Sequence, residues 1–251
     1  MKNLFVSLFF VAAVGTSFYS LDVSGSDKEK RSLKKDTVNI ADITESKPIF
    51  EEANPAKNLY SSLNFSENIL DEPVFETAYK GFENLKKGGK IAPEVHLLTI
   101  CDFSKSANTK RLWVIDTDRK EVLFNSLVAH GKNTGEEFAE KFSNTESSYQ
   151  SSLGFYVTDA TYDGDNGYSL KLLGMDKGFN DNALQRSIVM HGADYVSEDF
   201  ARQHKRIGRS WGCPAVPKDL AKPIINTIKN QNVLFIYYPD EDYLGSSEWL
   251  R

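Results

Sequence analysis

Two short segments of this chain place a histidine and a cysteine where they could work together. His191 ends the apolar run 187–190, and Cys213 lies among small and donor-bearing residues in the segment 210–214. A thiol is a poor nucleophile until it becomes a thiolate, and a neighbouring histidine is the usual base. The pair therefore predicts covalent catalysis at a carbonyl carbon, with Cys213 as the nucleophile and His191 as its base.

The residues around Cys213 suit the stabilisation of a tetrahedral intermediate. The backbone N–H groups of Gly212 and Cys213 can form an oxyanion hole, and a glycine lets the main chain come close to a substrate carbonyl. No acidic partner is required, because a backbone carbonyl can orient the second imidazole nitrogen. The residues predicted to contact the substrate are Ser210, Trp211, Arg209, His130 and Gly192.

Several of these residues also have structural interpretations. A free cysteine is often a small core residue, and this is expected for Cys101, which lies in an apolar strand pattern. A disulfide between Cys101 and Cys213 is the alternative, and it would remove the nucleophile. His130 ends another apolar run, so it either lines the cleft, orients His191 or has a structural role. For Trp211, the small polar neighbours favour a cleft wall over a core position.

The apolar pattern that must position these residues is mostly that of β-strands. After Pro93, short apolar or alternating runs are separated by polar turns, which is typical of a β-rich core. The fold class is therefore predicted as α+β and mainly β. The expected strands are 95–103, 111–117, 121–129, 154–158, 168–172, 187–190 and 233–238.

Helices are expected on either side of this strand-rich region. Asp71 can act as an N-cap with Pro73 in the first turn, and apolar residues then recur at three- and four-residue steps up to Gly88. A weaker helix is expected over 58–63. A further helix should begin at Pro223, because proline fits the first helical position.

The first residues are typical of an export signal. Lys2 supplies the positive charge, residues 4–14 form a short apolar stretch, and small residues at Ser17 and Ser20 suit cleavage. The stretch is shorter than the roughly 20 residues of a membrane-spanning helix, so a retained anchor is the less favoured alternative and stable membrane insertion is not expected. The charged, serine-rich residues 21–57 predict a disordered linker.

These patterns divide the chain into consecutive parts. The predicted boundaries are 1–20 for the signal peptide, 21–57 for the linker, 58–92 for a helical extension that packs on the catalytic domain, 93–240 for the catalytic domain and 241–251 for a C-terminal tail. Export places the expected location in the periplasm or cell envelope. The oligomeric state is left open.

Composition narrows the possible partners. The formal net charge is −5 with 251 residues, so no basic face dominates and a nucleic-acid partner is not expected. Zinc sites need three or four ligands at recognisable short spacings, and the cysteines and histidines here lack them, so neither a metal nor another cofactor is predicted. An anionic substrate must be held by local Arg and Lys side chains.

The arrangement of HG, a spacer and then S-x-G-C resembles the signature of the L,D-transpeptidase (YkuD-type) catalytic domains. The sequence segments HGADYVSEDF and GRSWGCPAVP are similar to those of the branch described as murein L,D-transpeptidase catalytic domain proteins. Similarity to this family also extends to the segments RLWVID, LVAHGKNTG, FSNTESSYQSSLGFY and GYSLKLLG. The resemblance covers roughly residues 58–239.

This resemblance implies a mostly β catalytic fold and a specific reaction on peptidoglycan stem peptides. The Cys213 thiolate would attack the carbonyl of the third residue of a stem tetrapeptide, release the terminal D-Ala and leave a thioester. A side-chain amine of a second stem would then give a 3→3 cross-link. By position, Cys213 matches the nucleophile, His191 the base, Gly212 with Cys213 the oxyanion donors, and Ser210 the motif serine.

The chain departs from the wider family after the cysteine. Many members carry an arginine two residues further on, whereas Cys213 is followed by Pro214, Ala215 and Val216. Arg209 and Arg206 are the candidates to replace that contact. Two other functions stay open: a hydrolase acting through the same thioester as an L,D-carboxypeptidase or endopeptidase, and a non-catalytic peptidoglycan-binding envelope protein.

Overall fold

The strand pattern after Pro93 gives an eight-stranded mixed sheet within residues 54–251, the part of the chain that the computed structural model describes. The strand order is β3-β2-β1-β8-β4-β5-β6-β7. Two neighbouring pairs, β1/β8 and β6/β7, are parallel, and the other pairs are antiparallel. The strands are β1 (Leu97–Asp102), β2 (Leu112–Asp116), β3 (Glu121–Ser126), β4 (Gly154–Gly164), β5 (Gly167–Gly174), β6 (Val189–Ala193), β7 (Ala215–Pro217) and β8 (Val233–Tyr237).

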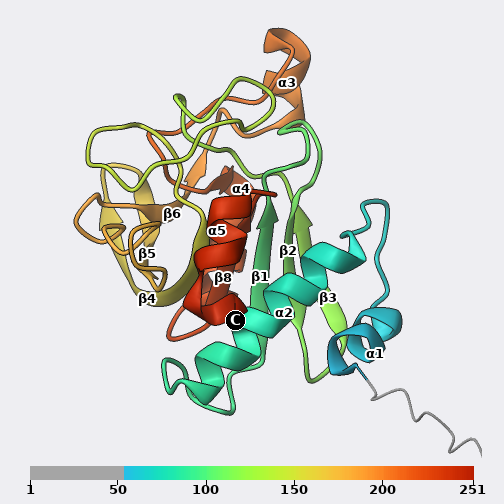
Figure 1. The fold of residues 1–251 in the computed structure, drawn as a ribbon. Helices are drawn as coiled ribbons and strands as arrows, with labels where there is room; N and C mark the ends of the chain where they lie inside the picture. Colours follow the sequence, from blue (N-terminus) through green and yellow to red (C-terminus); the bar gives the residue numbers. More distant parts are fainter. Residues whose placement is uncertain (1–53) are drawn as a thin grey trace, which may run out of the picture. The chain divides into compact units, whose positions relative to one another are not determined.

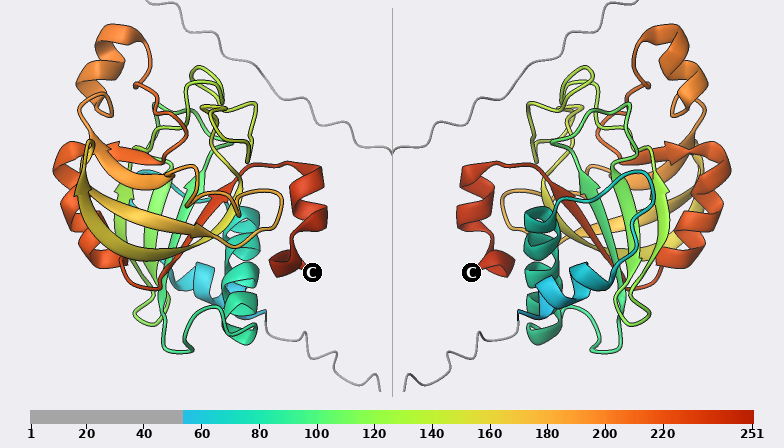
Figure 2. Two further views of the ribbon diagram at one scale, coloured as in Figure 1. Left: turned by 90° about the vertical axis from the view of Figure 1, so that its left-hand side faces the viewer. Right: turned by 90° about the vertical axis from the view of Figure 1, so that its right-hand side faces the viewer.

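Helices cover both faces of the sheet. Figures 1 and 2 show α2 and α5 on one face and α4 on the opposite face, while α3 projects at one end of the molecule. No residue of α3 is buried, in keeping with that projecting position. The helices are α1 (Pro55–Ser62), α2 (Glu72–Lys87), α3 (Glu198–His204), α4 (Lys218–Ile228), α5 (Glu241–Ser246) and the 3₁₀-helix η1 (Glu248–Leu250).

Helix α2 forms as its sequence predicts. Pro73 lies in its first turn, Gly88 is its C-cap, and its apolar stripe is buried against the sheet. Gly81 is needed for this packing, because a Cβ there would lie 2.0 Å from the Phe155 ring of β4. The absence of a side chain thus lets α2 approach the sheet closely.

The N-terminal boundary differs from the prediction. Helix α1 begins at Pro55, inside the predicted linker 21–57, because the Asn54 side chain accepts hydrogen bonds from the N–H groups of Ala56 at 3.0 Å and Lys57 at 3.3 Å. The predicted signal over 1–20 and the rest of the linker lie outside the described residues.

Three other elements correct the sequence expectations. Pro223 lies inside α4, which begins at Lys218, so the predicted helix start was wrong. The interior proline is tolerated because the apolar face of α4 is buried on the sheet, which outweighs one lost backbone hydrogen bond. Strand β7 was missed because three residues are too few to show alternation. The predicted tail 241–251 forms α5 and η1, with Tyr243 and Trp249 buried.

Within residues 54–251, none of the helices combines the length and the apolar character needed to cross a lipid bilayer.

Candidate active site

Parallel pairing of β6 with β7 brings the two predicted catalytic residues together. His191 lies in register with Ala215, and Gly192 with Val216. Cys213 precedes Ala215 by two residues, so continuing this register places it at the level of Val189 on the neighbouring strand. Because side chains alternate along a strand, residues two apart share a face. His191 and Cys213 therefore meet at one edge of the sheet although they are distant in sequence.

His191 and Cys213 line one cavity of about 480 Å³. Ser210, Trp211 and Arg209, predicted as substrate contacts, line it as well. A turn between β4 and β5 and the segment before β6 complete the wall. The full lining is Asp165, Asn166, Arg186, Ser187, Ile188, His191, Tyr195, Arg209, Ser210, Trp211 and Cys213.

Cys213 is an uncharged thiol in the resting protein. It is only 9% exposed, and burial raises its pKa, although the Val189 N–H and the Arg186 guanidinium act in the opposite direction. The Sγ atom donates to the carbonyl of Ser187 at 3.7 Å. The nucleophile must therefore lose its proton during the reaction.

His191 is held in the tautomer that a base needs. Its Nδ1 lies 3.1 Å from the Gly192 carbonyl, so Nδ1 carries the proton and Nε2 keeps its lone pair. Burial, with 4% of the residue exposed, lowers its pKa and keeps the ring neutral. No hydrogen bond joins His191 to Cys213 among residues 54–251; catalytic hydrogen bonds in unliganded sites often form only with substrate.

The loop before Cys213 is fixed by hydrogen bonds that change the predicted oxyanion hole. The Gly212 N–H donates to Ser210 Oγ at 3.0 Å, and Ser210 Oγ donates to the Cys213 carbonyl at 2.6 Å. Gly212 has φ +126°, and a Cβ there would lie 2.7 Å from the Gln150 carbonyl. The Gly212 amide is thus occupied, and the Cys213 N–H is the donor that makes no hydrogen bond to another described residue.

His130 does not line the cavity, so its predicted substrate contact was wrong. It is 1% exposed, its Nδ1 accepts from the buried Arg111 at 2.7 Å, and its Nε2 donates to the Gly135 carbonyl at 3.3 Å. The His130 carbonyl accepts from the Ser210 N–H at 3.0 Å. The structure therefore places His130 behind the loop that carries Cys213.

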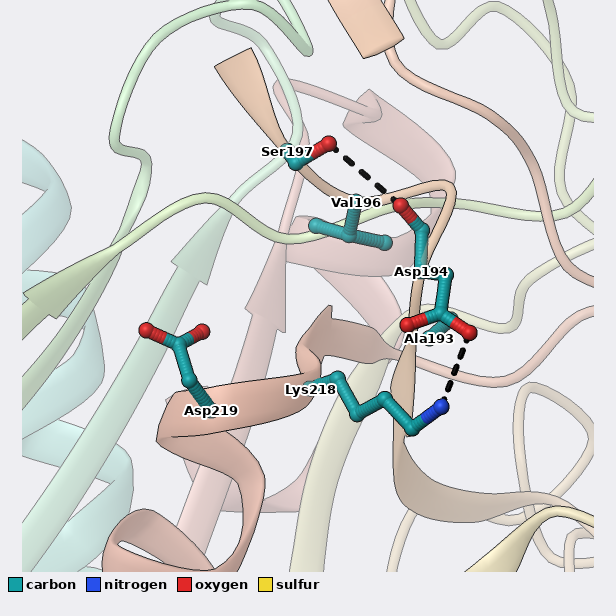
Figure 3. Close-up of a pocket in the computed structure, with 6 residues that line it drawn as sticks. All are labelled: Ala193, Asp194, Val196, Ser197, Lys218 and Asp219. Carbon is teal, nitrogen blue, oxygen red and sulfur yellow. Dashed lines mark hydrogen bonds and ion pairs between the residues drawn. The ribbon is translucent and has the colours of Figure 1, made fainter. Parts of the chain in front are cut away.

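Gly192 is also outside the cavity, which corrects another predicted substrate contact. A Cβ on Gly192 would lie 2.8 Å from that of Ala221 and 3.1 Å from the Cα of Lys218, so the glycine makes room for α4. A separate hollow of about 510 Å³ follows it at the end of β6. There the Lys218 ammonium donates to the Asp194 carboxylate at 2.8 Å, a pair that is drawn in Figure 3. That hollow contains neither His191 nor Cys213.

Most of the residues that form this fold match one protein family. The family model for the L,D-transpeptidase catalytic domain matches residues 66–237, more than half of the chain. The chain belongs to the L,D-transpeptidase catalytic domain family. No curated protein matches it.

Solved structures, two L,D-transpeptidases and a cell shape determining protein among them, resemble this family member only distantly. An L,D-transpeptidase from Mycobacterium smegmatis has 14% identity and a TM-score of 0.35, with 57% of this chain and 59% of that one covered. L,D-transpeptidase 1 of Mycobacterium tuberculosis has 12% identity and a TM-score of 0.33, covering 57% and 62%. The helical cell shape determining protein Pgp2 of Campylobacter jejuni has 12% identity and a TM-score of 0.40, covering 59% and 49%. The chain thus spans three fifths or less of most of these proteins.

Aromatic side chains form an exposed rim beside the candidate site. Trp211 is 71% exposed, which fits a cleft wall and excludes a core position. Its ring meets that of Tyr149 edge-on at 5.7 Å, and the Lys132 ammonium lies 4.0 Å from the Tyr149 ring centre. This rim offers apolar area and one positive charge to a ligand.

The alternative of a disulfide between Cys101 and Cys213 is excluded, since both cysteines are free. Cys101 is fully buried in β1, and burial raises its pKa to about 12. It is the small core residue that its sequence context indicated, and Cys213 stays available as a thiol.

Arg186 is a residue of this site that sequence reasoning missed. It lies in the cavity wall, where its charge lowers the pKa of Cys213. No motif marks it, because it comes from the segment between β5 and β6 and reaches the site only through the fold. Its one sequence signal is its position just before the strand that carries His191.

Proposed function

We propose that this protein is a peptidoglycan L,D-transpeptidase that works through a thioester on Cys213. The observation that carries the proposal is the shared cavity: the thiol of Cys213 and a neutral His191 line the same hollow in a chain of the L,D-transpeptidase family. Peptidoglycan stem peptides are the proposed partners, and no cofactor is needed for the chemistry.

The proposed first step transfers an acyl group to sulfur. His191 Nε2 removes the thiol proton as Cys213 Sγ attacks the carbonyl carbon of the third stem residue. The Cys213 N–H stabilises the developing oxyanion. The amide bond to the terminal D-Ala then breaks, the proton passes from His191 to the D-Ala amine, and a thioester remains.

The second step decides between transfer and hydrolysis. A side-chain amine of another stem attacks the thioester and restores the thiol, giving a 3→3 cross-link. Water as the acceptor gives a trimmed tripeptide stem, which is the L,D-carboxypeptidase alternative. Both reactions share the same acyl-enzyme, so the products distinguish them. Action on the cell wall requires export, which residues 1–20 are predicted to direct.

The test combines intact-protein and product mass spectrometry. The protein is incubated with a disaccharide tetrapeptide, and we expect a mass increase that corresponds to the acyl group without D-Ala. Cys213→Ala should abolish this adduct and reduce turnover by on the order of 10³-fold or more. Cys101→Ala is the matched control, and it should keep the adduct because Cys101 does not line the cavity.

Each product has a defined meaning. Dimers linked 3→3 support transfer, and tripeptide monomers without dimers support the carboxypeptidase alternative. Turnover that is equal in the parent and Cys213→Ala would exclude a cysteine mechanism. Binding of the substrate without an adduct or product would support the non-catalytic envelope protein.

A further inference from the structure

Arg186 lines the same cavity as the candidate nucleophile, yet the proposed reaction assigns it no task. Its neighbour Ser187 accepts the hydrogen bond from Cys213 Sγ at 3.7 Å, and Arg186 and Cys213 line the same cavity. Ser187 has φ +56°, a backbone region that residues other than glycine rarely adopt. Such strain is concentrated at functional sites, because surrounding contacts must hold it in place.

The guanidinium of Arg186 is bound only to neutral groups. Its Nη1 donates to the Ser143 carbonyl at 2.8 Å and to Ser152 Oγ at 2.5 Å, and its Nη2 donates to Ser148 Oγ at 3.1 Å and to the Gln150 carbonyl at 2.8 Å. All four acceptors belong to residues 143–152. This one side chain therefore fastens that segment beside the site.

The positive charge of Arg186 has no carboxylate partner among residues 54–251. Its Nε is buried, and no hydrogen-bond acceptor reaches it in the described part of the chain. A partly buried cation with an unsatisfied donor is unfavourable unless an anion forms beside it. Cys213 is the group in the cavity wall that becomes an anion when the proposed reaction begins.

We propose that Arg186 is the counter-ion of the Cys213 thiolate and also the residue that fastens residues 143–152 at the site. The inference rests on the proposed role of Cys213 as nucleophile. It divides the work between two side chains: His191 moves the proton, and Arg186 stabilises the charge that the proton leaves behind. Arginine cannot itself serve as the base, because it stays protonated at neutral pH.

The other ionisable groups of the cavity are less suited to this role. Arg209 is already paired with Glu136 at 2.7 Å and donates to two backbone carbonyls. His191 is kept neutral by burial. Asp165 and Tyr195 also line the wall but supply no positive charge.

Of the two arginines that the sequence suggested for the substrate contact of the family arginine, only Arg209 lines the cavity. Arg206 pairs with Glu136 at 2.9 Å and does not line the cavity. Arg186 comes from a different segment of the chain, so no comparison of residues around the cysteine motif could have found it.

The experiment measures how readily Cys213 reacts at each pH, without needing any substrate. The full chain is treated with iodoacetamide across a pH series, and the alkylation rate of Cys213 is followed by peptide mass mapping. Arg186→Gln removes the charge, and we expect the midpoint of the rate profile to rise by about 1 pH unit. Arg186→Lys keeps the charge, and its midpoint should stay close to that of the parent.

Controls separate charge from structure. Arg119→Gln removes an equal charge from an exposed turn far from the cavity lining, so its profile should not move. The double variant Ser148→Ala/Ser152→Ala keeps Arg186 but removes two of its acceptors. In that variant we expect faster amide hydrogen exchange in residues 143–152 with an unchanged alkylation midpoint. This hydrogen-exchange test of the double serine variant remains informative even if Arg186→Gln does not fold.

An unchanged midpoint in folded Arg186→Gln would overturn the inference, as would a Lys variant that shifts as far as the Gln variant. Unaltered exchange of residues 143–152 in the double serine variant would contradict the fastening role. Alkylation reports on the thiolate alone, so a chain that forms no acyl-enzyme but shows these shifts would refute the proposed function and leave the charge pairing intact.

Discussion

At the scale of single residues, the candidate site brings together two uncharged groups, the Cys213 thiol and the His191 imidazole. Burial raises the pKa of Cys213 and lowers the pKa of His191, so at neutral pH the thiol keeps its proton and the imidazole is free to accept one. A stable thiolate–imidazolium pair would need the opposite shifts. These pKa shifts favour proton transfer during the proposed attack, and Arg186 is the proposed counter-ion of the transient thiolate.

This arrangement predicts the acidic limb of the activity profile. His191 works as a base only when neutral, and its lowered pKa means that kcat/KM should begin to fall only below pH 6.5, the ordinary pKa of histidine. His191→Ala should reduce kcat/KM by about 10²- to 10⁴-fold and remove that limb. The measurement is kcat/KM for a tetrapeptide stem from pH 4 to 9. An acidic limb centred above pH 7 in the parent would contradict a neutral resting histidine.

That His191 and Cys213 would share one cavity could be predicted from the sequence, whereas the surroundings of the two residues could not. His191 and Cys213 stand in short segments whose residue types require each other chemically. His130 lies in a similar histidine–glycine segment, but its ring is buried and hydrogen-bonded to Arg111. That contact depends on Arg111, which comes from a distant part of the sequence just before β2. Local sequence shows which residues can react, but only the fold decides which of them face the cavity.

At the scale of elements, the predicted helices and strands were confirmed where the periodic pattern of apolar residues was long. Helix α2 and most strands of the sheet lie close to their expected ranges. Pro223 misplaced the start of α4, because burial of the Ile224, Ile225 and Ile228 face outweighs the local preference of proline. The three residues of β7 are recognisable only through their pairing with β6, which is the contact that assembles the site.

The C-terminal elements are expected to contribute to stability. Trp249 of η1 is buried, its Nε1 donates to the Met175 carbonyl at 2.9 Å, and its carbonyl accepts from Asn84 of α2 at 2.8 Å. Trp249→Ala should lower the free energy of unfolding by about 3 kcal/mol, since it empties a packed site and leaves the Met175 carbonyl unsatisfied. Urea unfolding followed by circular dichroism measures the change.

Trp211→Ala is the matched control for this experiment. It deletes the same side chain from an exposed position, so the free energy of unfolding should change by less than about 0.5 kcal/mol. A loss as small as this in Trp249→Ala would mean that the packing of η1 does not stabilise the domain.

At the scale of the whole molecule, a buried pair links the sheet to the loop that carries the nucleophile. Arg111 is fully buried and donates to the Val128 carbonyl at 3.1 Å and to the Lys105 carbonyl at 2.7 Å. Its guanidinium carbon lies 4.6 Å from the centre of the Phe103 ring. Burial lowers its pKa to about 9, which still leaves it charged at neutral pH. His130 connects this cation to Gly135 and, through its backbone, to Ser210.

The same pair predicts how stability depends on pH. Burial, together with the charges of Arg111 and Arg209, lowers the pKa of His130 to about 3. The unfolded chain binds a proton at this residue below pH 6.5, whereas the folded chain does not until about pH 3. The contribution of neutral His130 to stability is therefore complete above pH 6.5 and is lost as the pH falls. At pH 4.5 the loss should reach about 2–3 kcal/mol.

His130→Gln isolates this contribution, because glutamine can accept from Arg111 and donate to Gly135 but does not titrate. Asp102 and Asp176, whose pKa values burial raises, act with the opposite sign in both proteins and cancel in the comparison. Between pH 7 and 4.5, the free energy of unfolding should fall by about 2–3 kcal/mol more in the parent than in the variant. Urea unfolding at the two pH values measures this difference, and parallel losses would show that His130 accepts a proton in the folded protein. The acid sensitivity of the whole domain would then originate elsewhere than behind the Cys213 loop.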